Sequence, residues 1–361
     1  RPVYDNKNIP IEDVYSAKSS DDFVEIITRA LLYCKDSICI TGKNITAENS
    51  QVNEYIRGVS ESCPIAFMGY KGSNVSVLDT QIGGYKCYII NLEYDFEREA
   101  LINMKTELEK KAFEIISENI AKDMPPYMKV FIIHNYIVNN CKYAYDYESE
   151  GDPCNYTAYG ALVKGRAVCD GYASAAKILF DLCGVESLKI VGTSKGTGHA
   201  WNMVKLDNEY YHIDTTWDDP VGSDGIDRLK YNYYNITDDE IAKDHIWERS
   251  DYPSASGNVY TYLKTVELIR NDGNQYNEGY TSFESVFSKY PSFEADKEDI
   301  EPETQTVSSQ SVLSNYKDNI SVASGDIISY VYMKICEDPR LYLKIAGVFV
   351  IFILILKFIK R

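Results

Sequence analysis

Basic residues are scarce in this 361-residue chain: 37 Lys and Arg stand against 54 Asp and Glu, for a formal net charge of −17 at pH 7. No run of Lys and Arg with interleaved aromatic residues occurs before the extreme C-terminus. A chain of this charge repels phosphate backbones, so we expect no nucleic-acid partner. The length exceeds that of one typical domain and predicts two domains with additional segments.

The cysteines lack the patterns of disulfide-rich and zinc-binding proteins. There are nine, an odd number, and no two of them form a Cys-x-x-Cys pair. No Cys and His cluster has zinc spacing, so we expect no structural metal, and we expect no cofactor. Cys34, Cys39 and Cys87 lie in apolar runs and are predicted to be buried free thiols.

An initial Met and a hydrophobic signal segment are also missing, so we expect a mature or truncated form whose leader is absent. Residues 1–95 predict a small α+β domain, which we expect to serve in packing or substrate presentation. Its predicted helices cover residues 20–33, capped by Ser20, and 50–60, and its predicted strands cover 37–41, 65–70, 74–78 and 85–92. Residues 96–122 predict a connecting helix that ends at Asp123-Met-Pro-Pro.

The C-terminal part differs from the rest of the chain. Residues 291–340 are acidic and rich in Ser and Thr, a composition typical of a stalk. Residues 341–361 contain an apolar stretch with Lys344 and Lys357 near its ends, which is long enough to predict one transmembrane helix. The basic residues that follow it predict a cytoplasmic end. We therefore expect a single-pass anchor in a cell membrane with the catalytic domain outside.

Residues 123–290 carry the candidate chemistry, and its first element surrounds Cys169. Apolar residues recur at helical spacing from Val168 to Cys183, and Gly184 is a natural helix stop. Cys169 is therefore predicted in the first turn of a helix, where the dipole and the unpaired N–H groups favour a thiolate. A free cysteine considered alone is more often a small buried apolar residue.

A predicted hairpin supplies the second and third residues. Strands over 199–206 and 209–216 flank the turn Asp207-Asn208, and a two-residue turn pairs Leu206 with Glu209. This register makes His199 and Asp214 diagonal neighbours on one face, within reach of each other. A three-residue turn would reverse the parity and separate them.

The sequence contains other histidines that could compete with His199. His134 lies on a predicted amphipathic helix over 127–140 and is more simply explained as a structural residue. His212 shares the face of Asp214 under the same register and is the stronger competitor. We prefer His199 because only it stands in the sequence His-Ala-Trp-Asn.

Three blocks of sequence together resemble the transglutaminase-like superfamily of papain-type thiol enzymes, most closely its bacterial members. They are Gly-x-x-x-Cys-x-Gly-Tyr-Ala around Cys169, His-Ala-Trp-Asn from His199, and Asp-x-Thr-Trp-Asp from Asp214. The tail of this module, Tyr231-Asn-Tyr-Tyr-Asn-Ile-Thr-Asp and His245-Ile-Trp, is also similar. The resemblance covers residues 123–253. It implies an α+β papain-like core, in which a helix that starts at the Cys packs against an antiparallel sheet carrying the His and the Asp.

The resemblance implies that Cys169, His199 and Asp214 are the catalytic nucleophile, the acid–base and its orienting carboxylate. The expected reaction is attack on a peptide or protein amide bond through a Cys acyl-enzyme, followed by crosslinking, deamidation or hydrolysis, at a bacterial cell surface with cell-wall or surface proteins as partners. The alternatives are a cysteine peptidase and a surface binding or adhesion module without turnover. The backbone N–H of Cys169 is the expected first oxyanion donor. Tyr156 and Tyr159 are candidates for the second donor.

Overall fold

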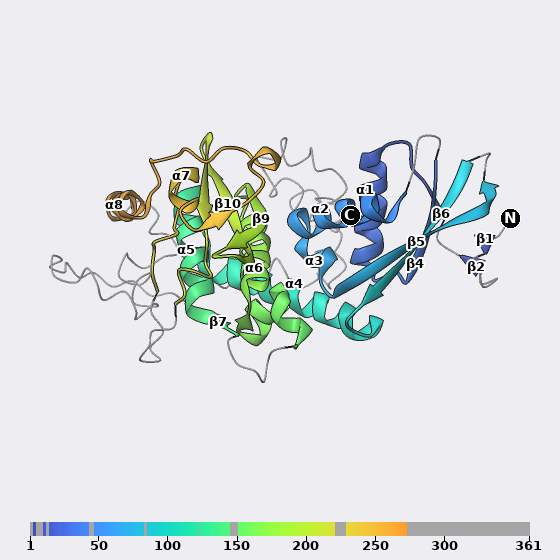
Figure 1. Cartoon of the computed structure of the whole chain (residues 1–361). Helices are drawn as coiled ribbons and strands as arrows, with labels where there is room; N and C mark the ends of the chain where they lie inside the picture. The colour runs from blue at the N-terminus through green and yellow to red at the C-terminus, as the bar shows by residue number, and fades with distance from the viewer. Residues whose placement is uncertain are drawn as a thin grey trace, which may run out of the picture. The chain divides into compact units, whose positions relative to one another are not determined.

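The computed structural model describes residues 14–272 except 43–46, 83–84, 122, 145–150 and 221–228, together with two short strands, β1 (Val3–Tyr4) and β2 (Pro10–Ile11). The predicted stalk and membrane segment lie outside these residues. Among the helices in the described ranges, none is long and apolar enough to cross a bilayer. The chain divides into two compact units, Arg1–Glu107 and a second that begins at Leu108. The division falls within α4 (Arg98–Asn119), at the place of the predicted connecting helix (Figure 1).

The first unit is built on a four-stranded sheet in the order β3-β4-β6-β5, in which only the β3–β4 pairing is parallel. The strands are β3 (Val14–Ser16), β4 (Ser37–Thr41), β5 (Tyr70–Ile82) and β6 (Tyr85–Tyr94). The helices α1 (Ser20–Leu32), α2 (Asn49–Ser62) and α3 (Pro64–Phe67) pack against one another. Buried Lys105 of α4 donates to the backbone oxygens of Leu31, Leu32 and Ala66, which ties α4 to α1 and α3.

Two expectations for this unit were wrong in detail. The strand predicted over 65–70 is instead the helical turn α3, because Pro64 occupies its first turn, where the fixed φ of proline favours a helix. The cap of α1 is Ser19 rather than Ser20: the Ser19 side chain accepts from the N–H of Asp22 at 3.2 Å. The predicted buried thiols Cys34, Cys39 and Cys87 are confirmed as buried and free.

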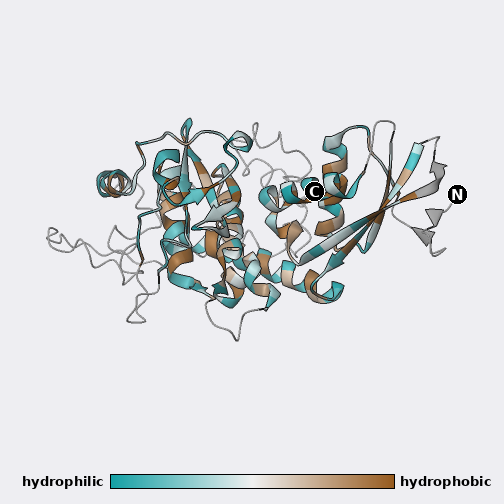
Figure 2. Ribbon diagram, in the orientation of Figure 1, coloured by the Kyte–Doolittle hydropathy of each residue, from teal (hydrophilic) through white to brown (hydrophobic). Residues whose placement is uncertain are grey.

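The second unit contains an antiparallel sheet in the order β11-β10-β9-β12. Its strands are β9 (Ser187–Ser194), β10 (Thr197–Leu206), β11 (Glu209–Ile213) and β12 (His245–Ile246). Helix α6 (Cys169–Leu182) packs against β9 and β10, and α5 (Pro126–Asn140) packs beside α6. In Figure 2, apolar and polar residues share most of the helices, so each helix can bury one face. The helix-start cysteine beside an antiparallel sheet is the predicted core architecture.

Shorter elements complete the second unit. They are β7 (Lys142–Tyr143), the 3₁₀ turn η1 (Pro153–Tyr156), the π-turn η2 (Gly160–Lys164), β8 (Arg166–Ala167), α7 (Asp238–Ile241), the 3₁₀ turn η3 (Arg249–Asp251) and α8 (Tyr262–Asp272). The face of the sheet that carries Trp201 and Met203 buries an apolar cluster with Ile190 and Ile241.

The predicted hairpin register is confirmed over most of its length. Leu206 pairs with Glu209, and the ladder continues to Asn202 opposite Ile213. Asp207 has φ 54°, the left-handed conformation that a tight hairpin turn requires. The predicted extension of the second strand to residue 216 is wrong, because the strand ends at Ile213 and the next residue turns the chain.

Candidate active site

Cys169 is the first residue of α6, as the apolar spacing predicted. The preceding π-turn ends at Gly165, whose φ of 69° lies in the region that glycine favours. Gly171, in the first turn of α6, lies so close to η1 that a Cβ would come within 2.8 Å of the backbone oxygens of Asn155 and Thr157. The Cys169 thiol is free and partly accessible. It therefore stands at a helix start that a close backbone contact holds in place.

A buried cation fixes the same end of α6 to the sheet. Lys189 of β9, fully buried, lies with Nζ 2.7 Å from Asp170 Oδ1 and 3.1 Å from Ser174 Oγ. Asn202 of β10 donates through Nδ2 to the backbone oxygen of Ala173 at 3.0 Å. These contacts limit how far the first turn of α6, and with it Cys169, can move against β10.

His199 on β10 contacts both other predicted residues. Its Nε2 lies 2.7 Å from Asp214 Oδ2, and its ring is close enough to Cys169 for the thiol to contribute to the raised pKa of His199. Because Nε2 is engaged with the carboxylate, Nδ1 is the ring nitrogen left for the thiol. The ring stacks on Trp201 with centroids 5.9 Å apart and meets Trp217 edge-on. The imidazole is therefore held between two indole rings, with Nε2 directed at Asp214 and Nδ1 left for Cys169.

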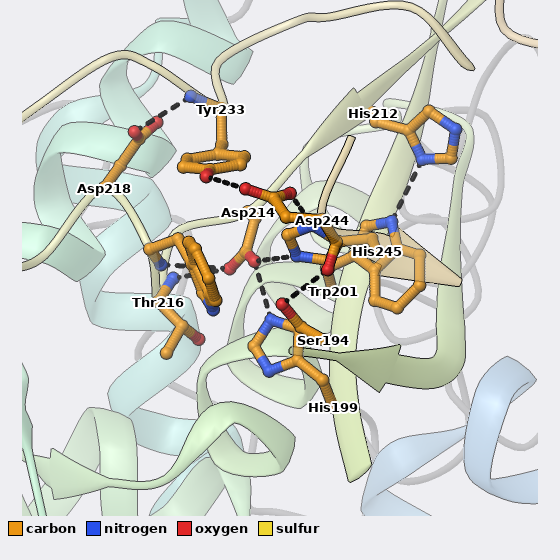
Figure 3. A network of polar contacts seen from close by, with 11 residues as sticks. Ser194, His199, Trp201, His212, Asp214, Thr216, Asp218, Tyr233, Asp244 and His245 are labelled. Atoms are coloured by element: carbon orange, nitrogen blue, oxygen red, sulfur yellow. Dashed lines mark hydrogen bonds and ion pairs between the residues drawn. The ribbon is translucent and has the colours of Figure 1, made fainter. Parts of the chain in front are cut away.

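Asp214 is fully buried and accepts hydrogen bonds on both carboxylate oxygens (Figure 3). Oδ1 accepts from the backbone N–H groups of Thr216 at 2.9 Å and Trp217 at 3.1 Å. This local bonding is that of an Asx turn and is the reason that β11 ends one residue earlier. Oδ2 faces His199. The carboxylate is thus oriented by its own turn toward the imidazole.

Burial and charge act in opposite directions on His199. Burial favours the neutral ring, but the charge and hydrogen bond of Asp214, with the Cys169 contact, outweigh it and raise the pKa of His199 to about 10. Burial alone would raise the pKa of Asp214. The charge and hydrogen bond of His199, followed by those of His245, instead hold that pKa well below its usual range. At neutral pH this arrangement favours the imidazolium, the form that stabilises a neighbouring thiolate.

His245 is a member of the cluster whose role sequence reasoning missed. Its Nε2 lies 3.1 Å from Asp214 Oδ2 and its Nδ1 lies 2.6 Å from Asp244 Oδ1 (Figure 3). The available signal was the His-Ile-Trp sequence in the tail of the module. His199, Asp214 and His245 also have ligand-type atoms within 4.8 Å of one another. Hydrogen bonds to Asp214 already engage both Nε2 atoms, so we interpret the group as a hydrogen-bonded cluster.

The competing histidine His212 has other partners. Its Nδ1 accepts from Trp201 Nε1 at 3.0 Å, so the proton is on Nε2, which lies 2.8 Å from Asp238 Oδ1. Burial lowers the pKa of His212 to about 4 even though Asp238 opposes this change. His212 is therefore a neutral residue that bridges the sheet to α7.

His134 forms a second buried pair, with Nε2 3.0 Å from Asp218 Oδ2. Asp218 Oδ1 accepts from the backbone N–H of Tyr233 at 3.0 Å. Burial raises the pKa of Asp218 to about 6, although the His134 hydrogen bond acts against this. Asp219, one residue later, accepts from Tyr172 Oη at 2.5 Å. These two carboxylates therefore connect α5 and α6 to the segment after β11.

The two tyrosines considered as oxyanion donors differ in their surroundings. Tyr156 is exposed, whereas Tyr159 is buried and the Lys164 ammonium lies 5.5 Å from its ring centroid. The first-turn N–H of Cys169 has no partner within the helix by construction and stays the expected first donor.

Comparison with known proteins identifies the superfamily of this core. Residues 114–215 match the model of the transglutaminase-like superfamily. The human protein kyphoscoliosis peptidase is 24% identical over 199 residues, which cover 49% of this chain and 28% of the relative. The mouse kyphoscoliosis peptidase is 26% identical over 116 residues, covering 29% of this chain and 18% of the relative. The chain thus spans less than a third of the curated relatives' length.

A solved structure of a TGase is similar at 17% identity and a TM-score of 0.27, covering 58% of this chain and 60% of that one. By the match of the family model, residues 114–215 form a transglutaminase-like core.

Proposed function

We propose that this chain is a thiol enzyme that cleaves peptide or protein amide bonds through an acyl-enzyme on Cys169. The observation that carries the proposal is that His199 contacts both Cys169 and Asp214 at the start of α6. The raised pKa of His199 adds to it, because an imidazolium beside the thiol favours the thiolate.

In the proposed first step, the Cys169 sulfur attacks the amide carbonyl carbon and forms a C–S bond. Negative charge develops on the carbonyl oxygen, where the N–H groups at the start of α6 can stabilise it. The C–N bond then breaks, and the leaving amine takes a proton from His199. Asp214 stabilises the imidazolium before this transfer and keeps Nε2 engaged, so that the other nitrogen faces the thiol.

In the second step, a nucleophile attacks the thioester and His199 takes its proton. An amine gives a crosslinked product and restores the thiol, whereas water gives a carboxylic acid, by deamidation of a side chain or by peptide hydrolysis. The peptidase reading draws support from the relatives named as a peptidase. A binding module without turnover is the remaining candidate, and the complete Cys–His–Asp set weighs against it.

The test is product analysis by mass spectrometry after incubation with peptides and a labelled primary amine. We expect amine adducts or deamidated side chains from a transferase, and new peptide termini from a peptidase. Cys169→Ala abolishes either product. Cys154→Ala is the matched control: Cys154 is also partly accessible, but burial and then the nearby Asp152 raise its pKa to about 11, so its loss leaves turnover unchanged. Turnover that persists in Cys169→Ala contradicts the proposal.

We also propose that the chain is anchored in a bacterial cell membrane through residues 341–359, with the catalytic unit outside and surface proteins as substrates. The support is the apolar stretch with its terminal basic residues. Truncation after residue 324 is expected to move the protein from the membrane fraction to the supernatant, and protease added to intact cells is expected to release the catalytic unit. Full membrane retention of the truncated chain argues against this anchor.

A further inference from the structure

Two histidines, not one, share an oxygen of the buried carboxylate. Asp214 Oδ2 lies 2.7 Å from His199 Nε2 and 3.1 Å from His245 Nε2. His245 is fully buried, so it lies out of reach of a substrate. Its other nitrogen bonds Asp244, whose Oδ2 accepts from Tyr233 Oη at 2.6 Å. We call His199, Asp214, His245 and Asp244 the Asp214 cluster.

The fold holds His245 in this place from the far edge of the sheet. Strand β12 pairs with β9, with His245 opposite Ser194. The backbone oxygen of Asp244 accepts from Ser194 Oγ at 3.0 Å and from the N–H of Lys195 at 3.2 Å. A Cβ on Gly192 would come within 2.3 Å of the Ile246 oxygen, so the close approach of β12 needs a glycine there. The position of His245 is therefore fixed from several sides.

We propose that His245 is a positioning residue: held by Asp244, it fixes Asp214 as an ionised hydrogen-bond acceptor for His199. This proposal rests on the proposed function, since it assigns a role within the same site. The titratable groups that face His245 are Asp214, Asp244, His199 and His212. Burial is the main cause that lowers the pKa of His212, and His245 adds to it. Tyr233, Trp201 and Trp217 complete its surroundings.

The expected effect of removing His245 follows from the state of Asp214. His245 supplies a hydrogen bond and a charge that lower the pKa of this fully buried carboxyl group. Without them, desolvation favours protonation of Asp214, and a protonated Asp214 no longer stabilises the His199 imidazolium. A positive charge on the His245 ring, whose centroid lies 5.2 Å from that of His199, would oppose the His199 imidazolium, so its removal would act in the opposite direction. We expect the first effect to dominate, because the carboxylate becomes partly unpaired in a site without solvent.

The experiment measures the rate at which iodoacetamide alkylates Cys169 between pH 4 and 9, by mass spectrometry of the Cys169 peptide from the full chain. In His245→Leu, the acid limb of this profile is expected to move upward by about one pH unit, a tenfold loss of rate on that limb. His245→Gln keeps an N–H donor for Asp214 and is expected to recover most of the rate. His134→Gln is the matched control, an equally buried histidine that pairs with a carboxylate outside the Asp214 cluster, and should leave the profile unchanged.

A double-mutant cycle separates positioning from a general loss of stability. If His245 acts through Asp214, then His245→Leu costs nothing further in the Asp214→Asn background. An unchanged acid limb in His245→Leu overturns the proposal. So does an equal loss of alkylation rate when His245→Leu is added to Asp214→Asn, and so does a His245→Gln variant that is alkylated as slowly as His245→Leu. If circular dichroism shows that His245→Leu does not fold, Asp244→Ala takes its place. Asp244 is partly exposed, and its loss removes the hydrogen bond that holds His245. An unchanged acid limb in Asp244→Ala, or an equal loss of rate in the Asp214→Asn background, then overturns the proposal.

Alkylation needs no substrate, so the outcome is readable even if no amide substrate is ever found. A shifted acid limb without turnover would support the positioning role and count against the proposed acyl transfer. Turnover by the wild type with an unchanged acid limb in His245→Leu would support the acyl transfer and count against the positioning role.

Discussion

Replacing Asp214 with Asn tests the site most directly, because it keeps the shape and removes the charge. The Asn side-chain oxygen can still accept from the N–H groups of Thr216 and Trp217, so the turn after β11 is preserved. The amide group then faces the two Nε2 atoms of His199 and His245 with donors instead of an acceptor. The hydrogen bond that orients His199 is lost while the backbone stays in place.

The size of the effect follows from the electrostatics of His199. Asp214 is the main reason that the pKa of His199 is raised from 6.5 to about 10 against the opposing effect of burial. A difference of that size corresponds to a factor of about three thousand in the stability of the imidazolium relative to the neutral ring, or about 5 kcal/mol. We therefore expect a loss of about a thousandfold or more in turnover, in line with triads that lose this carboxylate.

The assay compares the rate of Cys169 alkylation and, where a substrate is found, kcat with the binding of an unreactive substrate analogue. Asp218→Asn is the matched control, because Asp218 is also a buried carboxylate bonded to a histidine, four residues along the same turn. It should cost about 1–3 kcal/mol of stability and leave the chemistry of folded protein intact. Near wild-type rates in Asp214→Asn together with an inactive, folded Asp218→Asn would refute the assignment of the orienting carboxylate.

Three further predictions concern the thiol, the sheet edge and pH. Cys169 should react with iodoacetamide at pH 7 at least about tenfold faster than Cys154, since only Cys169 contacts His199; equal labelling of the two peptides would count against it. Gly192→Ala should displace β12 and reduce activity and melting temperature together, because its Cβ would collide with a backbone oxygen; an unchanged melting curve would show that the strand can yield. The folded protein holds the His199 proton more tightly than the unfolded chain does, so this contribution to stability is complete below pH 6.5 and is lost as pH rises through about 10. Urea unfolding between pH 7 and 10 should therefore show falling stability in the wild type and a flatter profile in Asp214→Asn, and parallel profiles would exclude His199 as the cause.

The sequence predicted those parts of the site that depend on local patterns. Helical spacing after Val168 and the stop at Gly184 located α6 and its first residue. The turn at Asp207-Asn208 set the register that brings Asp214 toward His199, because a two-residue hairpin allows only one pairing of the flanking residues. In both cases the information lies within a few residues of the feature.

The features that the sequence did not predict depend on contacts between distant segments. His245 reaches Asp214 only because β12 returns to the edge of β9, about thirty residues after the hairpin. A strand of two residues is too short to show a sequence periodicity, so its pairing with β9 could not be predicted. The His134–Asp218 pair likewise joins α5 to the segment after β11. The wrong strand over 65–70 has a local cause, since the proline at the start of α3 outweighed the β-rich residues that follow it.

The turn after β11 has a consequence for how this site can change in evolution. The Asp214 side chain has two functions: Oδ1 accepts the backbone hydrogen bonds of the turn that ends β11, and Oδ2 accepts the hydrogen bond from the His199 imidazole. A descendant that abandons the chemistry can exchange Cys169 at little cost to the fold, because that thiol is partly accessible at a helix start. It cannot exchange Asp214 as freely, since any residue other than Asn removes the side-chain oxygen that accepts from the N–H groups of Thr216 and Trp217 in the chain reversal that follows. Relatives that lose activity should therefore lose the cysteine at the position of Cys169 first and keep the aspartate at the position of Asp214 for its role in the turn.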